Sequence, residues 1–167
     1  MKRTFDVCMA ALGLVLTAPL LAIISVLIKL DSQGSVIFRQ VRVGQGFRPF
    51  AIQKFRTMAV DTPGTGLPLT VGQDSRITRI GRILRKCKLD ELPQLWNVLV
   101  GDMSFVGPRP EVPRYVERLR SEFSEVLTVR PGITDLASLR YIDEASILAH
   151  SSNPEEEYQL KVLPEKL

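Results

Sequence analysis

Two adjacent carboxylates, Asp90 and Glu91, are the side chains of this sequence best suited to chemistry. On a helix, successive side chains point about 100° apart, so this pair cannot act as a dyad that shares one proton. The two can instead divide the work around a phosphate: one attacks phosphorus or holds the reacting group, and the other binds a divalent cation. Mg²⁺ suits such a site, because it prefers one or two carboxylates together with phosphate oxygens.

Arginines flank the carboxylate pair. Arg85 precedes Asp90 in the sequence, and Arg109 stands between two prolines. Guanidinium groups bind phosphate with paired hydrogen bonds and offset the charge that develops during phosphoryl transfer. A purely structural interpretation is equally open, because acidic residues near the start of a helix stabilise it by interacting with the helix dipole. Pro93 is typical of such a helix start.

An apolar segment near the N-terminus must place this site, since Val7–Ile28 carries no charge. About 22 helical residues extend about 33 Å, which is enough to cross a bilayer. Pro19 interrupts the segment, and the Thr17 hydroxyl could bond a carbonyl that the proline frees. Both flanks are basic, which predicts that both ends lie on the cytoplasmic side: Lys2, Arg3, Lys29, Arg39 and Arg42. A re-entrant helix broken at Pro19 fits these features, while a spanning helix and a buried core helix remain alternatives.

Composition favours an anionic partner. The 167 residues have a net charge of +4 and are 45% hydrophobic, enough for one domain with a core. Cys8 and Cys87 form neither a metal-binding pattern nor a disulfide framework. No secretory cleavage pattern follows the apolar segment, so we do not interpret it as a signal peptide.

Periodicity predicts the elements between the apolar segment and the carboxylates. Alternating residues indicate a β-hairpin with strands at Val36–Gly44 and Pro49–Met58, followed by an exposed loop at 61–73. A basic amphipathic helix is expected from Ser75 to Lys88, which suits an anionic membrane surface. A solvated face or a nucleic-acid patch has the same pattern. The basic positions at helical spacing are Arg76, Arg79, Arg82 and Lys86, opposite Ile77, Ile80, Leu84 and Cys87.

Beyond the basic helix, further helices are expected at Leu89–Val100, at Arg114–Leu127, around Glu144 and from Asn153 onwards, with an extended stretch at 105–110 and a turn at 130–133. His150 is interpreted as a surface residue. The predicted fold class is α+β and mainly helical. Residues 1–30 form the re-entrant membrane helix, and residues 31–167 form a cytoplasmic catalytic domain with amphipathic interfacial helices and a small β-hairpin.

Three long runs closely resemble the bacterial sugar transferases known as monotopic phosphoglycosyl transferases: FRQVRVGQGFRPFAIQKFRTM, SRITRIGRILRK and LDELPQLWNVLVGDMSFVGPRP. The likeness covers nearly the whole chain. It implies transfer of a sugar 1-phosphate from a UDP-sugar to a polyprenyl (undecaprenyl) phosphate, with release of UMP. The reaction would take place at the cytoplasmic face of the bacterial inner membrane. It would be the first membrane step of glycan assembly, in exopolysaccharide or lipopolysaccharide biosynthesis.

The resemblance also implies residue roles. Asp90 would be the nucleophile, forming a phosphosugar-aspartate intermediate, and Glu91 would bind Mg²⁺. Lys54, Arg85 and Arg109 would contact substrate phosphates, and Pro19 would break the re-entrant helix. The protein is expected to contact inner-membrane phospholipid and not to bind nucleic acid. Pairing into a homodimer is left open.

Three departures from the family pattern stand out. Ala18 precedes Pro19 where members often have serine, so Thr17 or its neighbours must supply the hydrogen bond. Asp135 follows PGIT where many members have glycine, and the family usually continues past LPEKL, so a trimmed or short member is expected. Nothing in the sequence indicates which sugar is moved. The competing hypotheses are a membrane adaptor that binds through Arg76–Lys88 and a lipid-phosphate hydrolase that uses the same carboxylates with water.

Overall fold

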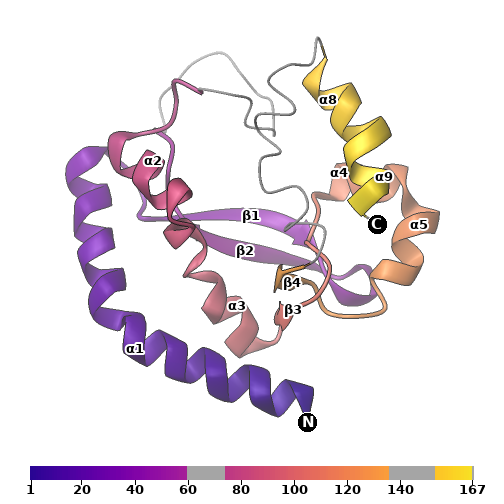
Figure 1. Ribbon diagram of the computed structural model, residues 1–167, viewed down its shortest axis with the longest axis horizontal. Coiled ribbons are helices and arrows are strands. Elements are labelled where there is room, and N and C mark those ends of the chain that lie inside the picture. Colours follow the sequence, from indigo (N-terminus) through magenta and orange to yellow (C-terminus); the bar gives the residue numbers. More distant parts are fainter. Residues whose placement is uncertain (60–73, 136–152, 167) are drawn as a thin grey trace.

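A computed structural model describes residues 1–59, 74–135 and 153–166 of the chain. The predicted loop at 61–73, the predicted helix around Glu144 and the predicted surface position of His150 lie outside the described residues. The described part is mainly helical, with a long apolar N-terminal helix and two small two-stranded sheets, as the predicted α+β class requires (Figure 1).

Helix α1 (Lys2–Asp31) runs through Pro19 as one helix, without the predicted division into two halves. Proline lacks the N–H that would bond the Val15 carbonyl, and such sites commonly bend a helix rather than end it. The Thr17 hydroxyl donates to the Gly13 carbonyl at 2.7 Å, so it does not serve the carbonyl that the proline leaves free. In Figure 1, α1 curves along the outside of the molecule from the N-terminus towards α2 (Arg79–Lys86).

One side of α1 packs on the rest of the protein and the other side is exposed. Ala10 lies in a core cluster with Ile52, while Ile24 and Ile28 lie in a second cluster with Phe55 and other residues. Among the described residues, α1 is long and apolar enough to cross a membrane, and only 11% of its most apolar window is buried. This low burial argues against the core-helix alternative. The outward apolar residues include Leu12, Val15, Leu16, Ile23, Val26 and Leu30.

Strands β1 (Ile37–Val43) and β2 (Pro49–Phe55) form the predicted antiparallel hairpin, with Val43 paired to Pro49 and Ile37 to Phe55. Their connection, η1 (Gln45–Phe47), is a 3₁₀ turn in which Gly46 has a positive φ of 63°. Glycine adopts this conformation without steric cost, so it suits the turn.

Helix α2 (Arg79–Lys86) starts at Arg79, so the prediction of a start at Ser75 was wrong. Residues before it serve other contacts: Met58 and Ile77 form an isolated β-bridge, and Arg76 binds the Asp74 carboxylate. Thr78 then caps the helix by accepting the backbone N–H of Gly81 at 3.0 Å.

The remaining elements surround the hairpin. After α3 (Gln94–Val100), strand β3 (Ser104–Val106) pairs in parallel with β4 (Gly132–Thr134), where the sequence predicted only a turn. The single helix predicted at Arg114–Leu127 is two helices, α4 (Pro113–Arg118) and α5 (Arg120–Val126), separated at Leu119. The predicted helix start at Asn153 is confirmed, and the segment comprises α8 (Pro154–Glu157), the π-helical turn η3 (Tyr158–Val162) and α9 (Leu163–Lys166).

Candidate active site

The carboxylate pair occupies a 3₁₀ turn of its own, η2 (Leu89–Glu91), between α2 and α3. The sequence predicted one helix over Leu89–Val100 with the pair in its first turn, and that start was wrong, because α3 begins only at Gln94. Helix α2 ends at Lys86, and Lys88, the residue before η2, lies in the left-handed region with φ 56°, which turns the chain so that η2 begins. Such a conformation costs a non-glycine residue about 1 kcal/mol or more, so the surrounding contacts must hold it in place.

Glu91 is the member of the pair whose negative charge is balanced by neighbouring cations. Its Oε1 accepts a hydrogen bond from Lys54 Nζ at 2.7 Å and another from Arg109 Nη2 at 3.4 Å. Burial opposes its ionisation, yet the charges of Lys54 and Arg109 outweigh burial and lower the pKa of Glu91 to about 2. Glu91 is therefore ionised at neutral pH and joins two of the predicted phosphate-binding residues.

Asp90 has the opposite environment. Its Oδ1 is buried and has no hydrogen-bond partner among the residues that the structure describes. Burial raises the pKa of Asp90 above its ordinary value, Lys54 opposes this rise, and the neighbouring Glu91 adds to it. An ionised Asp90 is thus more basic than an exposed aspartate, and its Oδ1 lies buried with no hydrogen-bond donor among the described residues.

Arg85, in the last turn of α2, is the third predicted phosphate-binding cation. Its Nε donates to the Thr57 hydroxyl at 2.9 Å, which fixes the guanidinium against the end of β2. Burial lowers the pKa of Arg85, and the charge of Asp90 raises it again, so the two groups interact electrostatically. The structure thus brings together five of the predicted residues: Lys54, Arg85, Asp90, Glu91 and Arg109.

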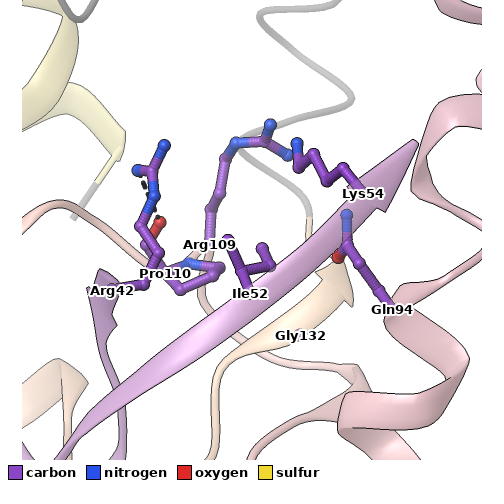
Figure 2. A pocket seen from close by; sticks show the side chains of 7 residues that line it. All are labelled: Arg42, Ile52, Lys54, Gln94, Arg109, Pro110 and Gly132. Atoms are coloured by element: carbon purple, nitrogen blue, oxygen red, sulfur yellow. Dashed lines mark hydrogen bonds between the residues drawn. The ribbon is translucent and has the colours of Figure 1, made fainter. Parts of the chain in front are cut away.

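A cleft adjoins Lys54 and Arg109, and its lining carries three cations and no carboxylate (Figure 2). Five of its lining residues were not predicted: Arg42, Ile52, Gln94, Pro110 and Gly132. The pairing register of the hairpin indicates that Arg42 belongs to the same face as Lys54. Because Arg42 pairs with Phe50, and Phe50, Ile52 and Lys54 alternate on β2, all four side chains belong to one face.

Two glycines hold the loop that carries Arg109. A Cβ added at Gly132 would lie 2.2 Å from the backbone nitrogen of Gly107, and the two segments exchange hydrogen bonds. The Gly132 N–H donates to Pro108 O at 2.9 Å, and the Gly107 N–H donates to Thr134 O at 3.1 Å. This close approach places Arg109 at the edge of the cleft.

The donor set fits a magnesium ion shared with substrate. No group of three potential metal-ligating side chains occurs in the part of the chain that the structure describes. Mg²⁺ does not require one, because it binds through one or two carboxylates plus phosphate oxygens and water. Asp90 Oδ1 is an unpaired buried acceptor, and Glu91 is ionised, so both carboxylates could serve.

The sequence profile of the family described as "Bacterial sugar transferase" matches residues 1–162. The chain belongs to the bacterial sugar transferase family. A relative in Bacillus subtilis, named as a putative undecaprenyl-phosphate N-acetylgalactosaminyl 1-phosphate transferase, is 45% identical over 80% of this chain and 70% of its own length. The family membership predicted from the sequence motifs is therefore confirmed.

Two further bacterial sugar transferases are similar to this family member. Both are named UDP-glucose:undecaprenyl-phosphate glucose-1-phosphate transferase. The Caulobacter vibrioides protein is 47% identical over 83% of this chain and 53% of its own length, and the Escherichia coli protein is 41% identical over 83% of this chain and 31% of its own length. The chain thus spans about half or less of these two relatives. All three names are those of transferases of phosphate-containing groups.

Proposed function

We propose that this chain transfers a sugar 1-phosphate from a UDP-sugar to a polyprenyl phosphate, with Asp90 as the nucleophile. The observation that carries the assignment is the contrast between the two carboxylates. Glu91 is neutralised by Lys54 and Arg109, whereas Asp90 keeps a buried oxygen without a hydrogen-bond partner among the described residues. An oxygen that no protein donor binds keeps its lone pairs free for attack on phosphorus once substrate reaches it.

The reaction proceeds in two displacements at one phosphorus. An Asp90 oxygen attacks the sugar-bearing phosphorus of the UDP-sugar, the bond from that phosphorus to the bridging oxygen breaks, and UMP leaves with the electron pair. The polyprenyl phosphate then attacks the phosphosugar-aspartate at the same phosphorus, and the Asp90 carboxylate is released. One site can thereby serve a soluble and a lipid-bound anion in turn.

The basic residues bind and orient the phosphates in this scheme. Lys54 and Arg109, held by Glu91, and Arg85, held by Thr57, would offset the charge that develops on the phosphate oxygens. Mg²⁺, bound by Glu91 with a contribution from Asp90, would supply further positive charge to the diphosphate.

Trapping the intermediate tests the proposal. The purified protein is incubated with a UDP-sugar panel and Mg²⁺ but without polyprenyl phosphate, and both UMP and the mass of the Asp90 peptide are measured. We expect UMP in an amount close to that of enzyme, and a peptide heavier by one sugar phosphate. Asp90→Asn should abolish both, whereas Glu117→Gln, a change at an exposed acid, should abolish neither. Continued UMP release without acceptor would indicate hydrolysis instead.

We further propose that α1 is re-entrant and that the protein lies on the cytoplasmic face of the inner membrane. The contacts at the start of α1 support this. Arg3 donates to the carbonyls of Val98 and Leu99 at the end of α3, at 2.5 and 2.9 Å. Asp6 is buried and accepts the Ser104 hydroxyl at 2.9 Å.

The end of α1 is bound to the same folded unit. Arg56, which follows β2, donates to the carbonyl of Ser32 at 2.7 Å, and Asp31 contacts α2. Asn97 joins α3 to β2 through hydrogen bonds with Ala51 and Gln53, so both anchoring regions belong to one body. A helix with both ends on one body cannot place them on opposite sides of a bilayer.

Cysteine labelling tests this topology. Cys8 and Cys87 are exposed and would first be replaced by serine. Single cysteines at Thr4 and Ser35, with Glu117→Cys as a marker of the catalytic domain, are then treated with a membrane-impermeant maleimide. We expect all three to react in inverted membrane vesicles and none in intact spheroplasts. Labelling of Thr4→Cys and Ser35→Cys from opposite sides would contradict the proposal.

A further inference from the structure

Arg42 is a buried cation of the cleft to which the proposed mechanism gives no role. Only 20% of its side chain is exposed, and it extends from β1 into the cleft that Lys54 and Arg109 also line. Figure 2 shows its guanidinium on the same side of β2 as the end groups of these two residues. Three cations therefore line one space, and each is also held by a carboxylate outside the cleft lining, Lys54 and Arg109 by Glu91 and Arg42 by Glu111.

The hydrogen bonds of Arg42 are incomplete. Nη1 donates to Pro110 O at 3.1 Å, and Nη2 donates to the amide oxygen of Gln40 at 2.9 Å. The remaining nitrogen, Nε, is buried and has no hydrogen-bond partner among the described residues. A buried donor without an acceptor is costly, and a ligand oxygen that entered the cleft lined by Arg42 would relieve this cost.

Glu111 and Tyr158 fix this arginine from behind. Glu111 is buried, its Oε2 accepts from Arg42 Nη1 at 3.4 Å, and its Oε1 accepts the Tyr158 hydroxyl at 2.7 Å. The Glu111 carbonyl also accepts the N–H of Val43, the neighbour of Arg42 on β1. The C-terminal turn η3 is thereby connected to the cleft through two side chains.

We propose that Arg42 is a further substrate-binding residue that contacts a phosphate group in this cleft, and that Glu111 and Tyr158 are positioning residues for it. The inference rests on the proposed function, and it adds a fourth cation to the phosphate-binding set. The ligand chemistry is a phosphate oxygen, which either the UDP-sugar or the polyprenyl phosphate could supply. The cleft carries the cations that such a group requires, and an arginine held at one edge by Glu111 presents its other donors in fixed geometry.

Steady-state kinetics with each substrate varied in turn tests the inference and names the source of the phosphate. Arg42→Gln should raise KM for one substrate by about tenfold or more, because hydrogen bonds to charged groups are among the strong ones. A rise for the UDP-sugar assigns the nucleotide phosphates, and a rise for the polyprenyl phosphate assigns the lipid phosphate. Arg42→Lys keeps the charge and should recover part of the loss.

The positioning roles have their own variants. Tyr158→Phe removes only the hydroxyl that binds Glu111, so it should raise the same KM by a smaller factor and leave kcat nearly unchanged. Glu111→Gln should act in the same direction. Arg39→Gln is the matched control, since Arg39 is an exposed arginine on the same strand, and it should alter neither KM. A merely structural role for Arg42 would lower the unfolding temperature without a KM change specific to one substrate.

Two outcomes would overturn the inference: unchanged KM values for both substrates in Arg42→Gln, or an equal rise of KM in Arg39→Gln. If Arg42→Gln is too unstable to assay, Arg42→Lys and Tyr158→Phe decide between the same outcomes. Failure of the proposed function is recognised separately, because the unaltered protein would then release no UMP. In that case, the unfolding temperatures of Arg42→Gln and of the unaltered protein are measured with and without inorganic pyrophosphate. A smaller rise in Arg42→Gln supports the inference, and equal rises contradict it.

Discussion

Asp31, the last residue of α1, accepts the backbone N–H of Ile80 in the first turn of α2 at 3.0 Å. One carboxylate therefore satisfies a donor that a helix start leaves unbonded, and its negative charge lies at the positive end of the helix dipole. Thr78 satisfies a second donor of the same turn, that of Gly81. The end of the apolar helix and the start of the basic helix are in this way fixed to each other.

Asp31→Ala should destabilise the protein by about 1 kcal/mol, the usual cost of losing a side chain that caps a helix. Asp31→Asn should cost less, because its amide oxygen still accepts the Ile80 N–H. Chemical unfolding in detergent, followed by circular dichroism, measures both. Equal losses in the two variants would show that charge rather than the hydrogen bond matters.

Asn97 is the second residue whose loss should be severe. It is 1% exposed, accepts the Gln53 N–H at 3.0 Å and donates to Ala51 O at 2.8 Å. Asn97→Leu leaves both backbone groups of β2 without partners, which should cost about 2 kcal/mol or more. Asn97→Asp should also destabilise, because a carboxylate cannot donate to Ala51 O. A loss below about 0.5 kcal/mol for Asn97→Leu, the size of an ordinary surface substitution, would contradict this account.

Gly132→Ala should displace the loop that carries Arg109. Its Cβ would lie 2.2 Å from Gly107 N and 2.4 Å from Gly107 O, where only backbone movement gives room. We expect a loss of stability of about 1–3 kcal/mol and a rise in KM for the UDP-sugar. Gly13→Ala is the control, since its Cβ meets only the flexible end of Leu95 at 3.3 Å. If both variants behave alike, the close approach does not hold Arg109.

The acid side of the pH–rate profile should report Asp90. In the proposed mechanism, attack requires the ionised carboxylate of Asp90, so activity should fall as the pH falls through its pKa. Because burial raises that pKa above 3.8, the decline should be centred at a higher pH than for an exposed aspartate. Lys54→Met removes a charge that lowers the pKa of Asp90 and should move the decline to still higher pH, whereas Glu91→Gln should move it lower. Residual activity in each variant, measured from about pH 4 to 8, gives these shifts.

Local pattern predicted what local interactions decide. The alternation of the hairpin, the apolar segment and the Asn153 helix start each depend on residues close in sequence, and each is present. Asp90 and Glu91 were found from their types alone, with Arg85 and Arg109. The resemblance added Lys54.

Long-range pairing decided the rest. Residues 75–78 look helical, yet the Met58–Ile77 bridge withdraws them from α2. Strand β4 could not be predicted, because it forms only by pairing with β3, which lies far from it in sequence. Arg42 resembled one more basic residue on a strand until the register placed it on the same face as Lys54.

The anchors of α1 have a consequence for how the protein is made. Arg3 binds the carbonyl of Val98, 95 residues later, and Asp6 binds Ser104, 98 residues later. At about 5–20 residues per second, a ribosome needs about 5–20 s to synthesise that interval. During this delay the apolar helix α1 has been synthesised, while the hydrogen-bond partners of Arg3 and Asp6 are still missing. Water and other surrounding groups must interact with Arg3 and Asp6 first, and the nascent chain replaces these interactions with contacts to α3 and β3 only once these elements have been translated.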